Sequence, residues 1–96
     1  MTVTYNALVQ KDVNRILKRY DSISARLGDE FWSELTSKIE ATAQNPGRSH
    51  PAGGDFRRVN LTRFPYHFLF RMLPGRIRIT VVRHHKRRPA YGRTRR

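Results

Sequence analysis

The spacing of apolar residues changes along the chain, and each change predicts a new element. Apolar and polar residues alternate over residues 2–6, which predicts a short strand. Over residues 8–27 the apolar residues recur at steps of three and four, which predicts an amphipathic helix that ends at Gly28. A second stripe of the same period follows Asp29, a good N-cap residue, and Asn-Pro-Gly at 45–47 ends this second helix.

The C-terminal half of the chain changes to the two-residue period of β-strands. Residues 47–55 are rich in Gly and Pro and predict a loop. Three runs follow, at 56–61, 64–73 and 76–84, in which apolar and polar positions alternate over much of the length. A Leu-Pro-Gly-Arg turn joins the last two runs, so we expect these two strands to pair antiparallel.

The two periods together predict an α+β domain with the element order β-α-α-β-β-β. Two helices would cover one face of an antiparallel sheet, and both Phe31 and Trp32 would lie in the core. In the last strand, alternation places Ile77, Ile79 and Val81 on one face. The uncovered face is expected to be a polar, basic concavity. Its side chains would be Arg58, Asn60, His67, Arg71, Arg78 and His84.

The amino-acid composition constrains the cellular location of the protein and the chemistry of its partner. The 96 residues contain no cysteine, no secretory signal and no apolar run near the ~18 residues of a membrane span, so we expect one cytoplasmic domain without a membrane partner. All seven acidic residues lie within 1–55, whereas residues 56–96 hold 13 of the 20 basic residues. With a net charge of +13, this asymmetry favours nucleic acid or an acidic protein as the partner.

Two stretches of the C-terminal half carry a family resemblance. Arg-Arg-Val-Asn-Leu-Thr-Arg-Phe-Pro-Tyr begins at residue 57, and a strand ending in His runs on into Arg-Arg-Pro-Ala-Tyr at 87–91. In this order, after a helix pair, they resemble the RelE/ParE toxins of type II toxin–antitoxin systems. The resemblance implies a toxin held inactive by a cognate, acidic antitoxin. RelE-like members cleave messenger RNA on the ribosome and ParE-like members poison DNA gyrase, on one shared fold.

The resemblance also assigns roles to individual residues, with ribosome-dependent mRNA cleavage as the first expectation. The catalytic side chains of RNA-cleaving members correspond to Arg57 or Arg58, Arg63, Arg83 and Tyr91. Cleavage by the 2′-hydroxyl group needs a base, an acid and cations that stabilise the phosphorane. Arginine stays protonated, so His84, with an ordinary pKa near 6.5, is the easier proton carrier. The basic residues expected to bind RNA phosphates are Arg57, Arg58, Arg78, Lys86, Arg87 and Arg88.

Several alternatives stay open at the level of the sequence. The same arginines could form a binding surface without chemistry, as in a gyrase inhibitor or in a non-toxic protein that binds RNA or the ribosome. An enzyme of this kind would be a metal-independent endoribonuclease, because His84 and His85 point to opposite faces of a strand and no third ligand is suitably spaced. We expect no cofactor. Residues 92–96 are expected to form a mobile basic tail.

Overall fold

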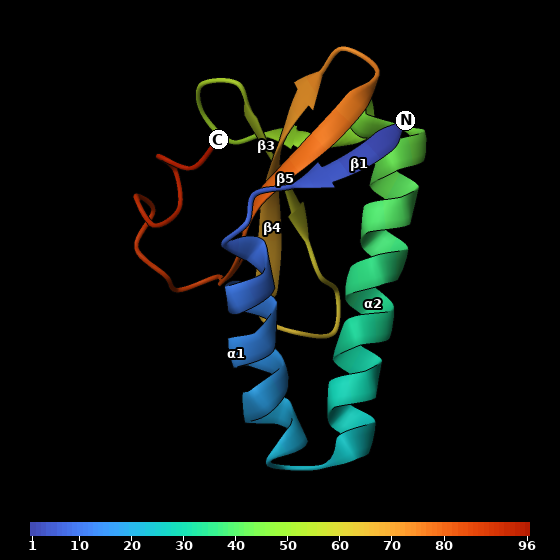
Figure 1. Ribbon diagram of the computed structural model, residues 1–96, viewed down its shortest axis with the longest axis vertical. Helices are drawn as coiled ribbons and strands as arrows, with labels where there is room; N and C mark the ends of the chain where they lie inside the picture. The colour runs from blue at the N-terminus through green and yellow to red at the C-terminus, as the bar shows by residue number, and fades with distance from the viewer.

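Two helices and a five-stranded sheet form two layers in the computed structural model, which describes residues 1–96 (Figure 1). Neither helix is long and apolar enough to cross a membrane. The elements are β1 (Thr2–Tyr5), α1 (Val9–Asp21), α2 (Ala25–Gln44), a short 3-10 helix (Pro46–Arg48), β2 (His50–Pro51), β3 (Phe56–Asn60), β4 (Tyr66–Leu73) and β5 (Arg76–His84).

The predicted α+β architecture, with both helices on one face of the sheet, is confirmed, although the sheet is mixed. The strand order is β1-β5-β4-β3-β2, and β1 pairs parallel with β5 while the other pairs are antiparallel. The helical hairpin returns the chain to the end of the sheet where β1 began, and the amino group of Met1 donates to the carbonyl of Ala43 (3.2 Å). Strand β3 runs in the direction of β1, and two antiparallel steps, from β3 to β4 and from β4 to β5, give β5 the same direction.

The boundary between the helices differs from the predicted one. Helix α1 ends at Asp21, and α2 begins after Ser24, whose hydroxyl accepts a hydrogen bond from the backbone N–H of Leu27 (3.1 Å). The predictions that Gly28 ends the first helix and that Asp29 caps the second are therefore wrong, because both residues lie inside α2.

The main core lies between the helices and the sheet. Val9, Val13 and Ile16 of α1 and Phe31 of α2 pack on the aromatic face of β4. Rings meet edge to face around Phe31, and Trp32 beside it is 50% exposed rather than buried in the core. The main cluster comprises Val9, Val13, Ile16, Phe31, Leu35, Ile39, Ala43, Leu61, Phe64, Tyr66, Phe68, Phe70, Ile77, Ile79 and Val82.

A bulge in β5 changes which residues face the helices. Phe70 pairs with Ile79 and its neighbour Leu69 pairs with Val81, so Thr80 is an extra residue in β5. Val81 then packs on the helix-free face with Leu69, while His84 contacts the ring of Tyr66 on the helix side. The predicted placement of Val81 and His84 is wrong, because the extra residue shifts the alternation by one.

The C-terminal segment, residues 85–96, covers part of the face that we expected to be open (Figure 1). Phe56, Leu69 and Val81 form a small second core there, against which Tyr91 packs. The prediction of a fully open face is therefore wrong, because the chain's own C-terminus covers this apolar surface, but Arg58 and Asn60 still line a basic pocket of about 420 Å³ on it. Within the predicted tail, Arg95 forms an ion pair with the buried Asp12 (2.6 Å), an attachment that the sequence did not indicate.

Candidate functional site

Arg83, near the end of β5, anchors the C-terminal segment. Its side chain is buried, and its Nε donates to Nε2 of His67 (2.8 Å). Its Nη1 donates to the carbonyls of Pro89 (2.8 Å) and Tyr91 (2.7 Å). Burial, followed by the charges of Arg58 and Arg93, lowers the pKa of Arg83. Because its Nε and Nη1 donors are engaged within the protein, Arg83 positions residues 89–91, and only its Nη2 is left for a substrate phosphate.

Tyr91 lies among arginines. The guanidinium of Arg87 stacks on its ring, with Cζ 4.0 Å from the centroid. Nη1 of Arg15 lies 3.5 Å and Nη2 of Arg95 3.4 Å from the hydroxyl oxygen. The hydrogen bond from Arg15 is the main cause that lowers the pKa of Tyr91. The hydroxyl group of Tyr91 is therefore more acidic than that of an ordinary tyrosine.

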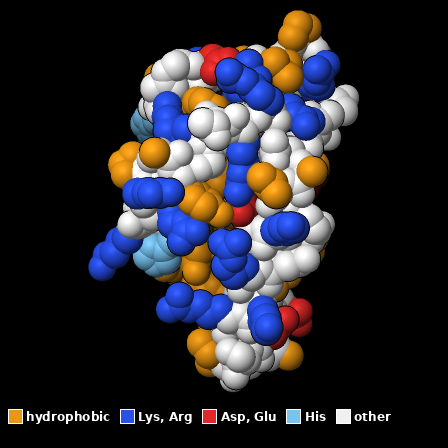
Figure 2. Space-filling view, turned by 60° about the vertical axis from the view of Figure 1, so that its left-hand side comes forward, with side chains coloured by type: hydrophobic (Ala, Val, Ile, Leu, Met, Phe, Trp, Pro, Cys, Tyr) orange, Lys and Arg blue, Asp and Glu red, His pale blue; other side chains and the backbone are white.

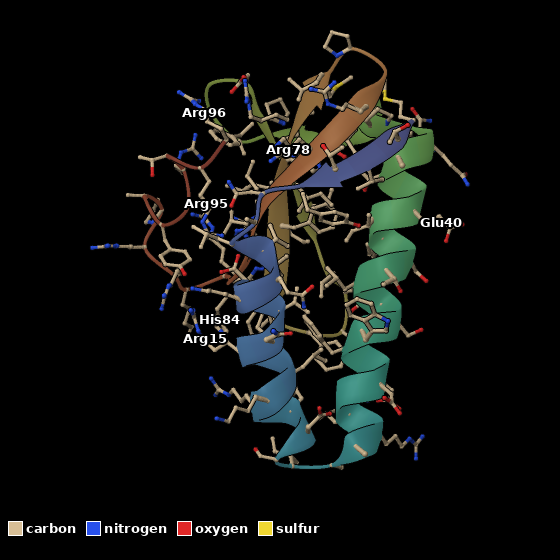
Figure 3. The ribbon with its side chains drawn as sticks, viewed as in Figure 1. Arg15, Glu40, Arg78, His84, Arg95 and Arg96 are labelled. Carbon is tan, nitrogen blue, oxygen red and sulfur yellow. The ribbon has the colours of Figure 1, made fainter.

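Tyr91 closes one side of a cleft between α1, the end of β5 and the C-terminal segment. The cleft has a volume of about 220 Å³. Arg15 and Arg19 line it from α1, and His84 and Arg87 line it from the other side. In Figure 3, Arg15 and His84 lie side by side at the edge of α1 that faces the C-terminal segment. Figure 2 shows many Lys and Arg side chains on this face and few acidic ones. We refer to this site as the arginine cleft.

A second group of basic residues lies on the other face of the sheet. Nδ1 of His67 lies 3.0 Å from Nδ1 of His85, and Nη2 of Arg58 lies 3.3 Å from the same His85 atom. Since His67 accepts from Arg83 through Nε2, its proton is on Nδ1 and is donated to His85. Burial, then Arg58, lowers the pKa of both histidines, that of His67 to about 3. The imidazoles of His67 and His85, which we call the histidine pair, are therefore neutral at pH 7.

The structure separates several residues that the sequence grouped together. Arg63 forms an ion pair with Glu30 of α2, and its backbone N–H donates to Glu34 (3.1 Å), so it lies in neither site. Arg57 donates to the carbonyl of Ser49 (2.8 Å) and Arg78 to that of Arg96 (3.1 Å). Three of the remaining predicted residues, His84, Arg87 and Tyr91, line the arginine cleft. Arg58 contacts the histidine pair, and Arg83 touches both sites. Lys86 and Arg88 are exposed on the connection after β5.

The sequence interpretation missed four residues of these sites. Arg15 and Arg19 are one turn apart on α1, and such like-charged pairs destabilise a helix slightly, so the pair was a signal of an anionic partner. His67 was expected near Arg58 on the uncovered face, but its contact with His85 had no comparable signal, because 18 residues separate the two histidines along the chain and only the sheet and the turn after β5 bring them together.

Comparison with known proteins now identifies the family. A family model described as "ParE toxin of type II toxin-antitoxin system, parDE" matches residues 3–89. The chain therefore belongs to the ParE toxin family, within the RelE/ParE group that the sequence indicated.

One solved structure, described as "Chromosomal ParDE TA system from P. aeruginosa", superposes with a TM-score of 0.76 at 17% identity. It covers 88% of this chain and 95% of its own, and at this identity it supports the fold. No curated protein matches. Tyr91, Arg93 and Arg95 lie beyond the residues that the family model matches.

Proposed function

We propose that this type II toxin stops growth by binding DNA gyrase, without cutting RNA. The observation that carries the proposal is the separation of the residues expected to cleave RNA. Arg83 is buried and bound to backbone carbonyls, and Arg63 is paired with Glu30 of α2. A phosphorane-stabilising site needs cations that converge on one point with free donors. Arg63 does not meet that requirement, and Arg83, which shares a pocket with Arg58, uses Nε and Nη1 within the protein.

The antitoxin is the second partner that we propose. An apolar groove of about 350 Å³ lies between α1, α2 and β1, with Trp32 and Tyr5 half exposed along it. Exposed apolar surface of this kind is typical of a protein–protein contact. Together with the net charge of +13, it favours an antitoxin segment that combines apolar side chains with acidic ones.

Ribosome-dependent mRNA cleavage is the second candidate, because of the histidine pair. His85 is exposed, neutral at pH 7 and adjacent to Arg58, so a base and a cation lie together there. In this mechanism Nδ1 of His85 would give up the hydrogen bonds from His67 and Arg58 to take the proton of the 2′-hydroxyl group. The 2′ oxygen would bond to phosphorus as the bond to the 5′ oxygen breaks, the 5′ oxygen would take a proton from water, and Arg58 would stabilise the phosphorane. This places the chemistry on residues other than His84 and Arg63.

Induced expression with and without the antitoxin separates the two candidates. We expect growth arrest with intact transcripts and a DNA-damage response, and we expect the purified protein to inhibit supercoiling by gyrase. His85→Gln is the matched variant. If the toxin acts by binding gyrase, the His85→Gln variant should remain toxic. Loss of toxicity in this variant, together with loss of new transcript ends inside translated messages, would favour cleavage and contradict our proposal.

A further inference from the structure

The arginines of the arginine cleft have no acidic partners. The four ion pairs of the protein use Arg26, Arg63, Arg71 and Arg95. Arg15, Arg19 and Arg87 take part in none of them, although all three line the same cleft of about 220 Å³. Arg15 and Arg19 are four residues apart on α1, so their charges repel one another. The cleft therefore has an uncompensated positive charge.

The single carboxylate in the wall of the cleft does not compensate this charge. Asp12 is 2% exposed and accepts hydrogen bonds from Nη1 (2.6 Å) and Nη2 (3.2 Å) of Arg95. It also accepts from the backbone N–H of Val82 (3.1 Å). With its oxygens bound in this way, Asp12 belongs to the interior, and the cleft presents only cationic and neutral donors to an incoming group.

The remaining donors of the cleft suit an anion with several oxygens. His84 accepts a hydrogen bond at Nδ1 from the backbone N–H of Lys86 (3.0 Å), so neutral His84 carries its proton on Nε2. The hydroxyl group of Tyr91 is a further donor. A carboxylate is satisfied by one arginine, whereas three guanidinium groups and a hydroxyl match the three terminal oxygens and the higher charge of a phosphate group.

The arginine cleft is not suited to recognition of a nucleobase. Arg87 already covers a face of the Tyr91 ring at 4.0 Å, so this ring is not free to stack on a nucleobase. A volume of about 220 Å³ holds a phosphate group and part of its sugar, but no base pair. Binding would therefore depend on phosphate and be independent of nucleotide sequence.

We propose that the arginine cleft binds a phosphate group of a nucleic acid, held by Arg15, Arg19 and Arg87 and by the hydroxyl group of Tyr91. The phosphate is either a terminal monoester, which presents three terminal oxygens, or a backbone diester, which presents two. The inference does not depend on whether the toxin acts on gyrase or on the ribosome, because both targets carry nucleic acid.

The test measures binding of a short, labelled single-stranded oligonucleotide, with and without a 5′-phosphate, to the full chain by fluorescence anisotropy. Replacing Arg15 and Arg19 by Gln should weaken binding by at least about tenfold, as expected when charge-assisted hydrogen bonds are lost. The charge-matched control replaces Arg48 and Arg76 by Gln, since both are exposed and outside the cleft. Thermal unfolding checks that both double variants fold.

The two oligonucleotides distinguish the sources of phosphate. Tighter binding of the 5′-phosphorylated strand, with competition by inorganic phosphate, identifies a terminal monoester. Equal binding of both strands identifies the backbone diester. Tyr91→Phe, which keeps the ring, should weaken binding less than the double variant. Equal weakening in the cleft and control variants would show diffuse attraction and overturn the proposal, as would the absence of binding to either strand.

Discussion

The histidine pair makes the stability of the protein dependent on pH in a definite direction. His67 is 1% exposed, accepts from Arg83 and donates to His85, so its ring cannot take up a second proton without losing a hydrogen bond. Its folded pKa is about 3, against 6.5 for an unperturbed histidine. Between these two values the unfolded chain binds more protons than the folded one. Stability therefore rises with pH across this window and is lost as the pH falls through it.

The expected size of the effect follows from the two pKa values. Lowering the pH from 7 to about 5 should reduce the free energy of unfolding by about 2 kcal/mol, because the unfolded His67 becomes protonated and the folded one does not. For a domain of this size, that corresponds to a fall in Tm of about 10 °C. Carboxylates with ordinary pKa values titrate mostly below pH 5, so histidines dominate this range, and His85, whose pKa is also lowered, adds an effect of the same sign.

Urea unfolding at pH 7, 6 and 5, followed by circular dichroism, measures the effect. His67→Gln is the matched variant, because glutamine can accept from Arg83 and donate to His85 but does not titrate. Its stability should change much less with pH than that of the natural protein. If both proteins lose the same stability between pH 7 and pH 5, the assignment of a neutral, buried His67 is wrong.

Three further predictions concern the attachment of the C-terminal segment and the helical hairpin. Asp12→Ala should reduce the free energy of unfolding by about 3 kcal/mol, because it leaves the partly buried Arg95 unpaired; an unchanged urea midpoint would contradict the buried ion pair. Gly92→Ala should destabilise by about 1–3 kcal/mol, because its φ is +80° and a Cβ would lie 2.7 Å from Val81. Gly75→Ala is the control, because Gly75 has a similar φ of +72° but a Cβ there would have no atom within 4 Å, so this change should lower the Tm less than Gly92→Ala does. Gly28→Ala should stabilise α2 by up to about 1 kcal/mol, since the Asp21 carboxylate that its Cβ would meet is exposed and can rotate away; a lower Tm would refute this.

The sequence determined the elements and most of the core. Apolar spacing located the helix pair, and β5 has the predicted bounds of residues 76–84. The aromatic face of β4 was also predictable, because Tyr66, Phe68 and Phe70 alternate and all three are buried. These features depend on local periodicity, which a single chain displays directly. The family resemblance followed from the same segments.

The tertiary structure alone decided the composition of the candidate sites. One extra residue in β5, Thr80, moved His84 to the helix side and left Arg83 on the other face, and no residue type in the sequence marks that bulge. The fold also brings Arg15 of α1 to Tyr91, 76 residues later. Periodicity reports which face a residue occupies within its element, whereas a site depends on register and on contacts between distant segments, which only the folded chain fixes.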